Sequence, residues 1–211
     1  MKILHFLILI LFAVLFLGSS RVGLNKSYKI NNGETISGST STVNGRITVG
    51  ENANVNGECR TVNGNIDVGA HSKVRDLATV NGNVSVGRDT LVKGDIELVN
   101  GRVHCEPDVK VTGCVGVVNG KISLKKTLIE KDLSTYNGNI ELSDNTIIGG
   151  DIIIKEKHGT FTGYRKLKIE IDNSSVEGDI INEDPDYDVV VYLTNGGKVK
   201  GKIIDAKVVE K

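Results

Sequence analysis

Apolar residues recur along this chain at intervals of six. From Val62 to Val92 every sixth residue is valine. Four residues after each of these valines stands an apolar or small residue, namely Ile66, Ser72, Ala78, Val84, Thr90 and Ile96. Gly, Asn and Asp separate the apolar pairs, so each six holds only a short extended piece. The pattern predicts short β-strands joined by tight corners, with these two columns facing inward.

The six-residue units are themselves grouped into a longer repeat. Asn-Gly occurs after Val or Tyr136 at Asn44-Gly45, Asn63-Gly64, Asn81-Gly82, Asn100-Gly101, Asn119-Gly120 and Asn137-Gly138, at intervals of three sixes or one position more. One such pair is a strong hairpin signal. A meander of hairpins, however, needs a turn roughly every 8 to 12 residues, with period-two alternation on both sides. A pattern that returns in register after three sixes instead indicates coils of about 18 or 19 residues.

The sequence therefore predicts an all-β, single-domain parallel β-helix, or β-solenoid, with three short strands per coil. Equivalent residues of successive coils stack about 4.8 Å apart, the spacing of neighbouring strands. A repeat of this kind tolerates length variation where loops project from one side. We expect the additional residue of the longer coils at one such point, which the alignment of sixes places at Thr61, Leu98 and Val117.

The Asn-Gly corners have two predicted properties. Gly accepts a left-handed backbone freely and Asn accepts it better than most residues, so we expect a left-handed conformation there. Asn side chains stacked on parallel strands also hydrogen-bond to one another along the stack. The Asn residues are therefore expected to form a structural ladder rather than a ligand site.

The spacing loosens after Ile148. The corner Val92-Lys93-Gly94-Asp95-Ile96 has counterparts at 148–152, 176–180 and 199–203. We expect one solenoid over residues 36–211, regular to about residue 154, with longer coils and two surface loops beyond, at His158–Tyr164 and Asn182–Asp188. Residues 21–35 are polar and poorly patterned, and are expected to form an N-terminal lead-in or cap.

Residues 1–20 have the pattern of a secretory signal peptide. The stretch Ile3–Gly18 is almost wholly apolar, follows Lys2 and ends in Gly18-Ser19-Ser20, small residues of the kind found at cleavage sites. About 16 residues in a helix reach only ~24 Å, short of a ~30 Å hydrocarbon core. Cleavage and export to the periplasm or surface of a bacterium are expected, with an uncleaved anchor as the alternative.

Composition narrows the function classes. The chain has 26 basic and 26 acidic residues, and the bases are scattered among the acids. A nucleic-acid partner requires clustered Lys and Arg and is therefore not expected. Without residues 1–20 the chain has no Trp and only Phe161 as Phe. The core must therefore be aliphatic.

The three cysteines fall in different columns. Cys59 and Cys105 take positions held elsewhere by Val, Ile or Leu, so they are expected to be small buried hydrophobic residues. Cys114 takes the position of Glu58 and Asp95 and is expected to face water. An odd number in an exported chain leaves intermolecular pairing of Cys114 as a hypothesis.

The stretches VNGNIDVG (62–69) and VKGDIEL (92–98) resemble two bacterial families over roughly residues 38–154. One is the bactofilin, or polymer-forming cytoskeletal, type, and the other is the putative-adhesin domain built from T-V-N-G-x-I repeats. The resemblance implies a right-handed, triangular parallel β-helix that associates end to end. The strict six-residue repeat is also similar to the left-handed hexapeptide fold, so the β-helix could be right-handed or left-handed. Typical bactofilins lack a signal peptide, and the one here favours an envelope version of the architecture.

Candidate chemistry is sparse. Hexapeptide-fold acyltransferases and zinc enzymes need histidines, and beyond residue 20 the chain has only His71, His104 and His158, the first two on different predicted faces. Polysaccharide-cleaving β-helices need paired carboxylates or a metal-assisted cleft. The outward acids in this register are Asp67, Asp95, Glu97, Glu141 and Asp151. We interpret these acids as solvated faces, and the acidic segment Asn182–Asp188 as a solvated loop. No catalytic, cofactor-binding or metal-binding residue is predicted.

These observations favour a non-enzymatic structural scaffold or interaction surface in the bacterial cell envelope. The expected partners are a second copy of the chain, by end-to-end stacking or as a homo-oligomer, or a cell-envelope component, with no nucleic acid and no small-molecule substrate. One alternative is a surface adhesin or ligand-binding module that uses Phe161, Tyr164 and Tyr187. Another is a secreted carbohydrate-active or hexapeptide-type acyltransferase enzyme.

Overall fold

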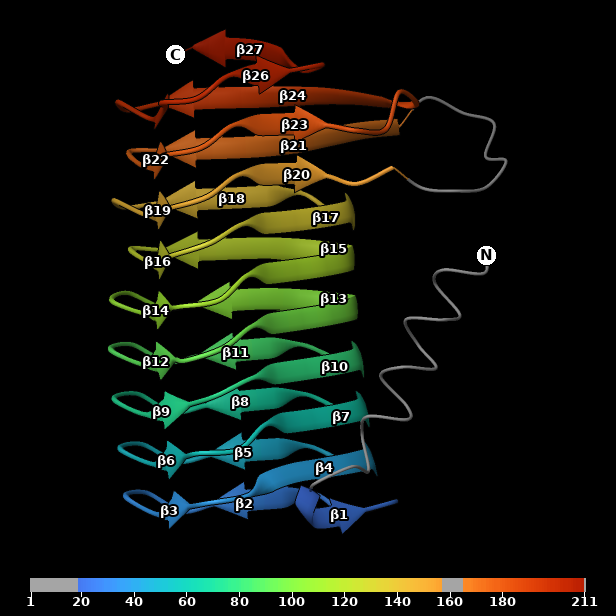
Figure 1. Cartoon of the computed structure of the whole chain (residues 1–211), viewed down its shortest axis with the longest axis vertical. Coiled ribbons are helices and arrows are strands. Elements are labelled where there is room, and N and C mark those ends of the chain that lie inside the picture. Colours follow the sequence, from blue (N-terminus) through green and yellow to red (C-terminus); the bar gives the residue numbers. More distant parts are fainter. Residues whose placement is uncertain (1–18, 157–164, 211) are drawn as a thin grey trace.

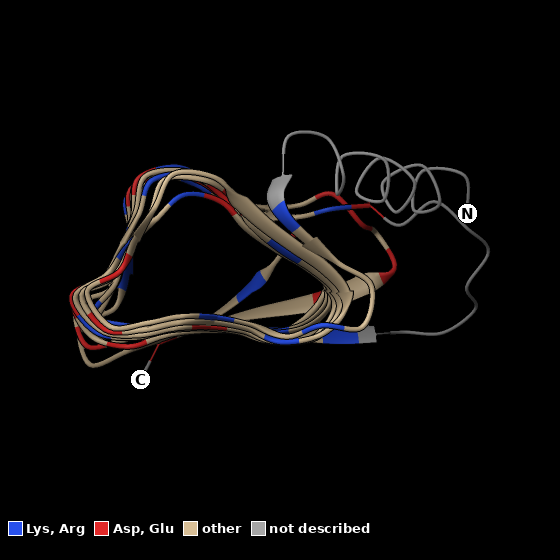
Figure 2. Ribbon diagram, turned by 90° about the horizontal axis from the view of Figure 1, so that it is seen from below, with Lys and Arg blue, Asp and Glu red and all other residues tan. Residues whose placement is uncertain are grey.

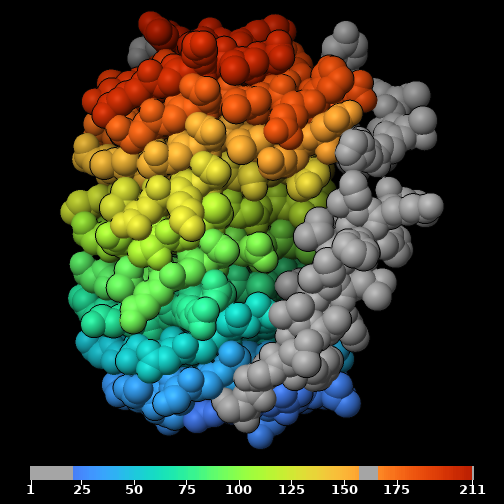
Figure 3. Space-filling view, in the orientation of Figure 1, coloured from blue at the N-terminus to red at the C-terminus, as the bar shows by residue number. Residues whose placement is uncertain are grey.

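The computed structural model describes residues 19–156 and 165–210, and every regular element in them is a β-strand. The strands wind into about ten coils that stack along one axis (Figure 1). Viewed along that axis, the coils superimpose on a triangular outline (Figure 2). In the space-filling view the successive layers of the sequence lie as bands one above another (Figure 3). The predicted β-solenoid is confirmed.

Three faces make up each coil. Face 1 contains β1 (Ser19–Gly23), β4 (Ser39–Asn44), β7 (Cys59–Asn63), β10 (Leu77–Asn81), the first halves of β13 (Ile96–Cys105) and β15 (Val115–Lys125), β17 (Leu133–Asn137), β20 (Ile152–Ile154), β23 (Ile180–Asn182) and β26 (Ile203–Ile204). Face 2 contains β2 (Tyr28–Ile30), β5 (Ile47–Val49), β8 (Ile66–Val68), β11 (Val84–Val86), the second halves of β13 and β15, β18 (Ile140–Ser143), β21 (Arg165–Asp172), β24 (Tyr187–Thr194) and β27 (Lys207–Glu210). Face 3 contains β3 (Thr35–Ile36), β6 (Asn54–Val55), β9 (Lys73–Val74), β12 (Leu91–Val92), β14 (Lys110–Val111), β16 (Leu128–Ile129), β19 (Ile147–Ile148), β22 (Ser175–Val176) and β25 (Lys198–Val199).

Neighbouring coils pair in parallel. Leu77 of β10, for example, lies between Cys59 of β7 and Ile96 of β13. On face 2, Val84 lies between Ile66 and Val103. Every pairing between the described strands is parallel, with equivalent positions of the repeat side by side, so the Asn-Gly pairs do not form hairpins.

The core is aliphatic, as the composition predicts. The inward side chains of face 2 are fully buried in coil after coil, including Ile47, Ile66, Val84, Val103, Ile122 and Ile140. Their counterparts on face 3 include Val55, Val74, Val92, Val111, Ile129 and Ile148. Burying such a side chain contributes about 1.5–3 kcal/mol, and neighbouring coils share the benefit.

One of the predicted columns points the wrong way. Val62 and Val80 were expected inside, yet in their strands the neighbours Thr61 and Thr79 are fully buried. Because side chains alternate along a strand, these valines face outward. Ala78 is likewise outward, between the inward Leu77 and Thr79. The outward valine belongs to every coil, since Thr42 and Leu98, the counterparts of Thr61 and Thr79, are buried as well. The corner at Arg75-Asp76, one residue shorter than its counterparts, accounts for Ala78 alone, because it puts Leu77 in the inward place that Cys59 holds one coil earlier.

The position of the additional residue is therefore also corrected. Thr61 pairs with Thr42 and Thr79, and Leu98 pairs with Thr79 and Val117, so none of them is inserted. Length varies instead at two other corners. Val92 is separated from Ile96 by Lys93-Gly94-Asp95, whereas only Arg75-Asp76 separates Val74 from Leu77. At the other corner, between faces 2 and 3, one coil has Asp144-Asn145 where the preceding coil has Lys126 alone. A residue added inside a paired strand would reverse every following side chain, whereas a corner absorbs it.

The C-terminal part continues the solenoid as expected. Ile148, Val176 and Val199 stack in register on face 3, as do Ile152, Ile180 and Ile203 on face 1. Residues 157–164, which hold the whole of the first expected surface loop, lie outside the described residues. The second expected loop is shorter than Asn182–Asp188, because β23 runs to Asn182 and β24 starts at Tyr187.

At the N-terminus the solenoid begins earlier than expected. Within residues 21–35, assigned above to a lead-in or cap, β1 pairs with β4, β2 with β5, and β3 with β6. This segment is thus the first coil. Polar residues dominate it because it has a neighbouring coil on one side only. No helix in the described residues is long and apolar enough to cross a membrane.

Candidate functional site: stacked polar columns

An asparagine ladder runs along the corner between faces 1 and 2. Each Asn side chain donates from Nδ2 to Oδ1 of the Asn one coil earlier, at 2.8–3.0 Å up to Asn119 and 3.4 Å at Asn137. The members are Asn25, Asn44, Asn63, Asn81, Asn100, Asn119 and Asn137. These side chains are exposed, and the predicted ladder is confirmed. Asn25 lacks a following Gly, so only its distance of 19 residues from Asn44 could have identified it.

The glycines of this corner serve close packing and not a left-handed turn. A Cβ on Gly82 would lie 1.9 Å from the carbonyl oxygen of Gly64, and one on Gly64 would lie equally close to that of Gly45. None of the six Asn has a positive φ. Among the six Gly, only Gly101 and Gly120 do, at 151° and 154°, far from the left-handed helical values near about 57°. The predicted left-handed conformation is wrong at this corner, and steric exclusion of any side chain accounts for the Gly column.

The left-handed corner lies instead between faces 2 and 3. Each coil has a residue with φ between 42° and 69° there, and one coil has two, Asp144 and Asn145. The set also includes Gly33, Asn52, His71, Asp89, Asp108, Lys126 and Asn173. Most members are Asn, Asp or Gly, which tolerate this region best. His71 and Lys126 show that the column accepts other residues, so its composition alone did not mark it.

An aspartate column occupies the corner between faces 3 and 1. The Oδ1 atom of Asp95 accepts the backbone N–H of Cys114 at 2.7 Å, and that of Asp151 accepts the N–H of Asp179 at 2.7 Å. Asp76, Asp132 and Asp179 make the same contact with the next coil. Sequence analysis had identified only Asp95 and Asp151, as outward acids. The structure gives both a structural role, since each carboxylate satisfies a backbone donor that the corner leaves without a strand partner.

The other outward acids lie apart from one another. On face 2, Asp67 pairs with Arg46 at 3.4 Å, and Glu141 pairs with Lys121. Asp67 and Glu141 share one outward column but are separated by Ser85, His104 and Ser123, one from each intervening coil. Four coil spacings amount to about 19 Å, too far for a carboxylate pair to act on one glycosidic bond.

Glu97 has the most perturbed of these carboxyls. It lies on face 1, one residue beyond Ile96 and close to the aspartate column. Burial raises its pKa, repulsion from Asp95 and Asp76 adds to this, and the charge of Arg60 opposes it. A raised carboxyl pKa is common at functional sites but also arises in structural ion-pair networks.

The two histidines among the described residues, His71 and His104, lie at different places in the coil. His71 is at the left-handed corner, where Nδ1 lies 3.6 Å from Asp89 Oδ2. His104 is on face 2, stacked between Ser85 and Ser123. His158 lies outside the described residues. Within residues 19–156 and 165–210, no three His, Cys, Asp or Glu side chains are grouped so that they could hold a metal ion.

The cysteines are placed as the columns predict. Cys59 and Cys105 are fully buried, and burial raises the pKa of each thiol to about 12. Cys114 is half-buried and lies in the aspartate column, where its backbone N–H donates to Asp95. None of the three forms a disulfide within the chain.

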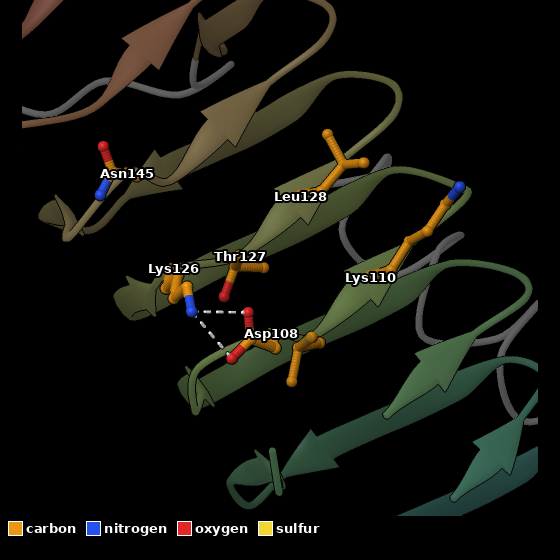
Figure 4. Close-up of a pocket in the computed structure, with 7 residues that line it drawn as sticks. Asp108, Lys110, Lys126, Thr127, Leu128 and Asn145 are labelled. Atoms are coloured by element: carbon orange, nitrogen blue, oxygen red, sulfur yellow. Dashed lines mark hydrogen bonds and ion pairs between the residues drawn. The ribbon is translucent and has the colours of Figure 1, made fainter. Parts of the chain in front are cut away.

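One shallow hollow opens beside the left-handed corner (Figure 4). It is lined by Asp108, Val109, Lys110, Lys126, Thr127, Leu128 and Asn145. Lys126 Nζ lies 3.0–3.1 Å from the carboxylate oxygens of Asp108, and Lys110 is paired with Glu130, so each charged side chain that lines the hollow has a partner of opposite charge. The hollow is wide and open, unlike the concave sites that bury small ligands.

The segment Asn182–Asp188 is less solvated than expected. Asp184 and Tyr187 are 4% and 6% exposed. Asn182 Nδ2 donates to the carbonyl oxygens of Tyr187 and Asp205, and its Oδ1 accepts the N–H of Asp184. Tyr187, one of three aromatic residues considered for ligand binding, therefore belongs to the core. Phe161 and Tyr164 lie outside the described residues.

Comparison with protein-family models, with curated proteins and with solved structures finds no match for this chain. The β-solenoid class rests on the coil geometry described above.

Proposed function

We propose that the protein is a non-enzymatic, exported β-solenoid that acts as a structural scaffold or interaction surface in a bacterial cell envelope. The observation that carries this proposal is the asparagine ladder. Seven exposed amides follow one edge of the solenoid at a constant pitch, each fixed by its neighbours. Side chains held in this way present the same surface in every coil without further ordering cost.

The remaining polar groups support a structural role. The carboxylates of the aspartate column accept backbone N–H groups, and several surface acids are ion-paired. In Figure 2 basic and acidic segments both occur around the whole outline, so no side carries one sign of charge. A uniform, mixed-charge prism suits contact with a protein or an envelope polymer better than binding of a polyanion.

Export is proposed from the sequence of residues 1–20, with cleavage near Gly18-Ser19-Ser20. The first strand, β1, starts at Ser19, so such cleavage would leave the solenoid coils intact. The stretches VNGNIDVG and VKGDIEL resemble bactofilins and putative adhesins. This resemblance also supports an envelope scaffold, and like the proposal of export it comes from the sequence.

End-to-end self-association is proposed as one mode of assembly. In the last coil Val208 pairs with Val191 and so follows an inward column, yet it is 44% exposed whereas Val191 is fully buried. Val199 and Ile203 of that coil are only partly buried. Among the described strands, β25, β26 and β27 each pair with a neighbouring strand on one side only, and an open strand edge favours addition of another strand layer.

The test is expression of the full chain with a C-terminal epitope tag in a bacterium, followed by fractionation and electron microscopy. The proposal expects a shortened chain in the envelope or periplasmic fraction, beginning near Ser19, and short rods or filaments after purification. A full-length chain confined to the cytoplasm would refute the export part. Hydrolytic or acyl-transfer activity of the purified chain would refute the non-enzymatic part.

A further inference from the structure

The C-terminal end of the described solenoid leaves its aliphatic core open. Each inward residue of the last coil follows a column that is fully buried one coil earlier, since Val199, Ile203 and Val208 pair with Val176, Ile180 and Val191. Val208 is nevertheless 44% exposed, and Val199 and Ile203 are only partly buried. At this end β27 is the outermost layer (Figure 1). The core of the tube therefore reaches the surface on all three faces of the last coil.

At the N-terminal end, charged side chains take two of the inward positions. Arg21 pairs with Thr40 and so holds a place that is fully buried one coil later. Glu34 stands one coil before the buried Ala53 in another inward column. The Nη2 atom of Arg21 lies 3.3 Å from Oε1 of Glu34. The first coil is therefore crossed by an ion pair where the following coils have uncharged side chains.

This ion pair is held in place by the corner beside it. Oε2 of Glu34 accepts the backbone N–H of Asn31 at 2.8 Å and its Nδ2 at 3.1 Å. The backbone hydrogen bond from Asn31 and then the one from Arg21 lower the pKa of Glu34, so the carboxylate stays ionised. The aliphatic inward residues of the same coil, Ile30 and Ile36, are 0% and 7% exposed. The core is thus sealed by polar groups at this end and open at the other.

We propose that two copies of this chain join through their C-terminal ends into a closed, coaxial pair, related by a two-fold axis that passes beside Val208 at right angles to face 2. The inference rests on the end-to-end association proposed above, and it names the end that is used and the size of the assembly. Each copy covers the aliphatic end of the other. The sealed N-terminal ends point away from each other, so growth stops at the pair.

The two-fold axis pairs the open strand edges. β27 of each copy runs antiparallel beside β27 of the other and continues face 2. Residues directly opposite in an antiparallel pair lie on the same side of the sheet, so the inward Val208 meets Val208 of the second copy. Ala206 then lies opposite Glu210, and the small side chain leaves the carboxylate room to reach water. On the other two faces β25 of each copy lies against β26 of the other, which brings Val199 to Ile203.

The N-terminal end of a second copy is a poor partner for the same surface. Head-to-tail stacking would press Val208 and Val199 against the ion pair of Arg21 and Glu34. Removing an ion pair from water without offering it new hydrogen bonds is strongly unfavourable. A second C-terminal end instead presents aliphatic residues on the same three faces of the same outline. The chemistry of the two ends therefore favours a closed pair over a growing filament.

The strength of the pair comes from two sources. Covering Val208, Val199 and Ile203 removes apolar surface from water, and pairing the open edges supplies backbone hydrogen bonds. Only one coil end of each copy is covered, which limits the area of the contact. We therefore expect a reversible pair at micromolar concentration and not a permanent one.

The experiment is sedimentation velocity and electron microscopy of the full-length chain without a C-terminal tag, since a tag would follow β27. Wild type is expected to form a rod of two copies in equilibrium with the monomer. Val208→Lys is expected to weaken the pair at least about tenfold, because two like charges would meet at the axis in an apolar contact. Ser37→Lys, at an exposed position of the first coil, is the control and should leave the equilibrium unchanged. Circular dichroism establishes that each variant is folded.

Removing the seal gives a second measurement. The double variant Arg21→Thr/Glu34→Ala installs the residues that Thr40 and Ala53 supply one coil later, and it deletes the ion pair. Its N-terminal end is then open as well, and rods longer than two copies are expected. If this variant is folded and still stops at two copies, the ion pair does not limit growth and the proposal is wrong on that point.

A cysteine on the axis tests the register. In a Cys114→Ser background, Val208→Cys is expected to form an inter-chain disulfide under mild oxidation, because directly opposite residues of an antiparallel pair lie within disulfide reach. Ser37→Cys, in the sealed coil, is expected to form none.

Wild-type monomer at all concentrations overturns the proposal, and this is also the result if another protein or a further segment covers the C-terminal end. Wild-type filaments would agree with the end-to-end association proposed above but would overturn the closed pair. Neither result bears on export or on the lack of enzymatic activity, which the fractionation and activity measurements test, so the failures are distinguishable.

Discussion

Asn81 donates a hydrogen bond of 2.9 Å from Nδ2 to Oδ1 of Asn63, a residue 18 positions earlier in the chain and one coil away. The same contact joins Asn100 to Asn81. Each interior Asn therefore acts once as donor and once as acceptor, and still has one N–H and one lone pair directed at its surroundings. The ladder both links the coils and forms the edge of the surface proposed for contact.

Removing one Asn from the middle of the ladder should weaken the fold measurably. Asn81→Ala deletes two side-chain hydrogen bonds, each with a net contribution of about 0.5–1.5 kcal/mol. Because the groups are exposed, water compensates in part, and we expect a loss of about 1 kcal/mol in the free energy of unfolding. Urea titration followed by circular dichroism measures it. Asn56→Ala, at an exposed Asn outside the ladder, serves as control, and equal losses in both variants would contradict the role of the ladder.

The glycine column should tolerate no side chain. In Gly82→Ala the new Cβ would start 1.9 Å from the carbonyl oxygen of Gly64, so the backbone of one coil must shift. We expect a loss of about 3 kcal/mol or more, as for an overpacked core. Gly116→Ala is the matched control, because its nearest heavy atom, Ser134 Oγ, is 3.5 Å away. A Gly82→Ala variant as stable as Gly116→Ala would show that close approach does not explain the column.

At the left-handed corner between faces 2 and 3, introducing a glycine should leave stability unchanged or raise it, whereas a bulky residue should lower it. Asn52 has φ of 55° and an exposed side chain. Asn52→Val places a β-branched residue in that region and should cost about 1–2 kcal/mol, whereas Asn52→Gly should be neutral or slightly stabilising. Thermal unfolding of the two variants measures the difference. The interpretation is wrong if Val and Gly are tolerated equally.

The buried thiols predict a specific loss of stability at high pH. In the folded chain the pKa values of Cys59 and Cys105 are raised to about 12, from an ordinary value of 9.0. The raised pKa means that the unfolded chain loses these protons first. The contribution to stability is therefore fully present below pH 9 and is lost as the pH rises from about 9 toward 12, by up to about 1.4 kcal/mol per pH unit for each thiol.

The double variant Cys59→Val/Cys105→Val isolates this contribution from the titration of other groups. Its stability should fall less steeply than that of wild type over the same pH interval in urea titrations. Identical slopes would contradict the burial of the thiols.

In native protein at pH 8, a maleimide reagent should label Cys114 alone, because the other two thiols are inaccessible and protonated.

The sequence was sufficient for the architecture because one repeated pattern specified it at several levels. The long period of three sixes, the apolar columns and the six Asn-Gly pairs all indicated stacked coils, and the ladder through Asn81 and Asn63 followed from them. Cys59 and Cys105 could be assigned to the core since they replace aliphatic residues in the same columns.

Local geometry could not be derived in the same way. Asn-Gly is typical both of a left-handed turn and of a close backbone approach, and only the structure shows that the carbonyl of Gly64 excludes a side chain at Gly82. The left-handed corner contains His71 and Lys126, which carry no signal for that conformation. A corner one residue shorter at Arg75-Asp76 puts Leu77 in the inward place that Cys59 holds one coil earlier, so Ala78 was wrongly assigned inside.

The most direct test of the stacked-coil account is a nuclear Overhauser measurement on isotopically labelled protein. Ser85 lies beside Asp67 and His104, its partners in the two neighbouring coils. The account predicts cross-strand contacts between the backbone protons of Ser85 and those of both residues, each a full coil away along the chain. Contacts instead between Thr79 and Val84, across Asn81-Gly82, would show an antiparallel hairpin and contradict it.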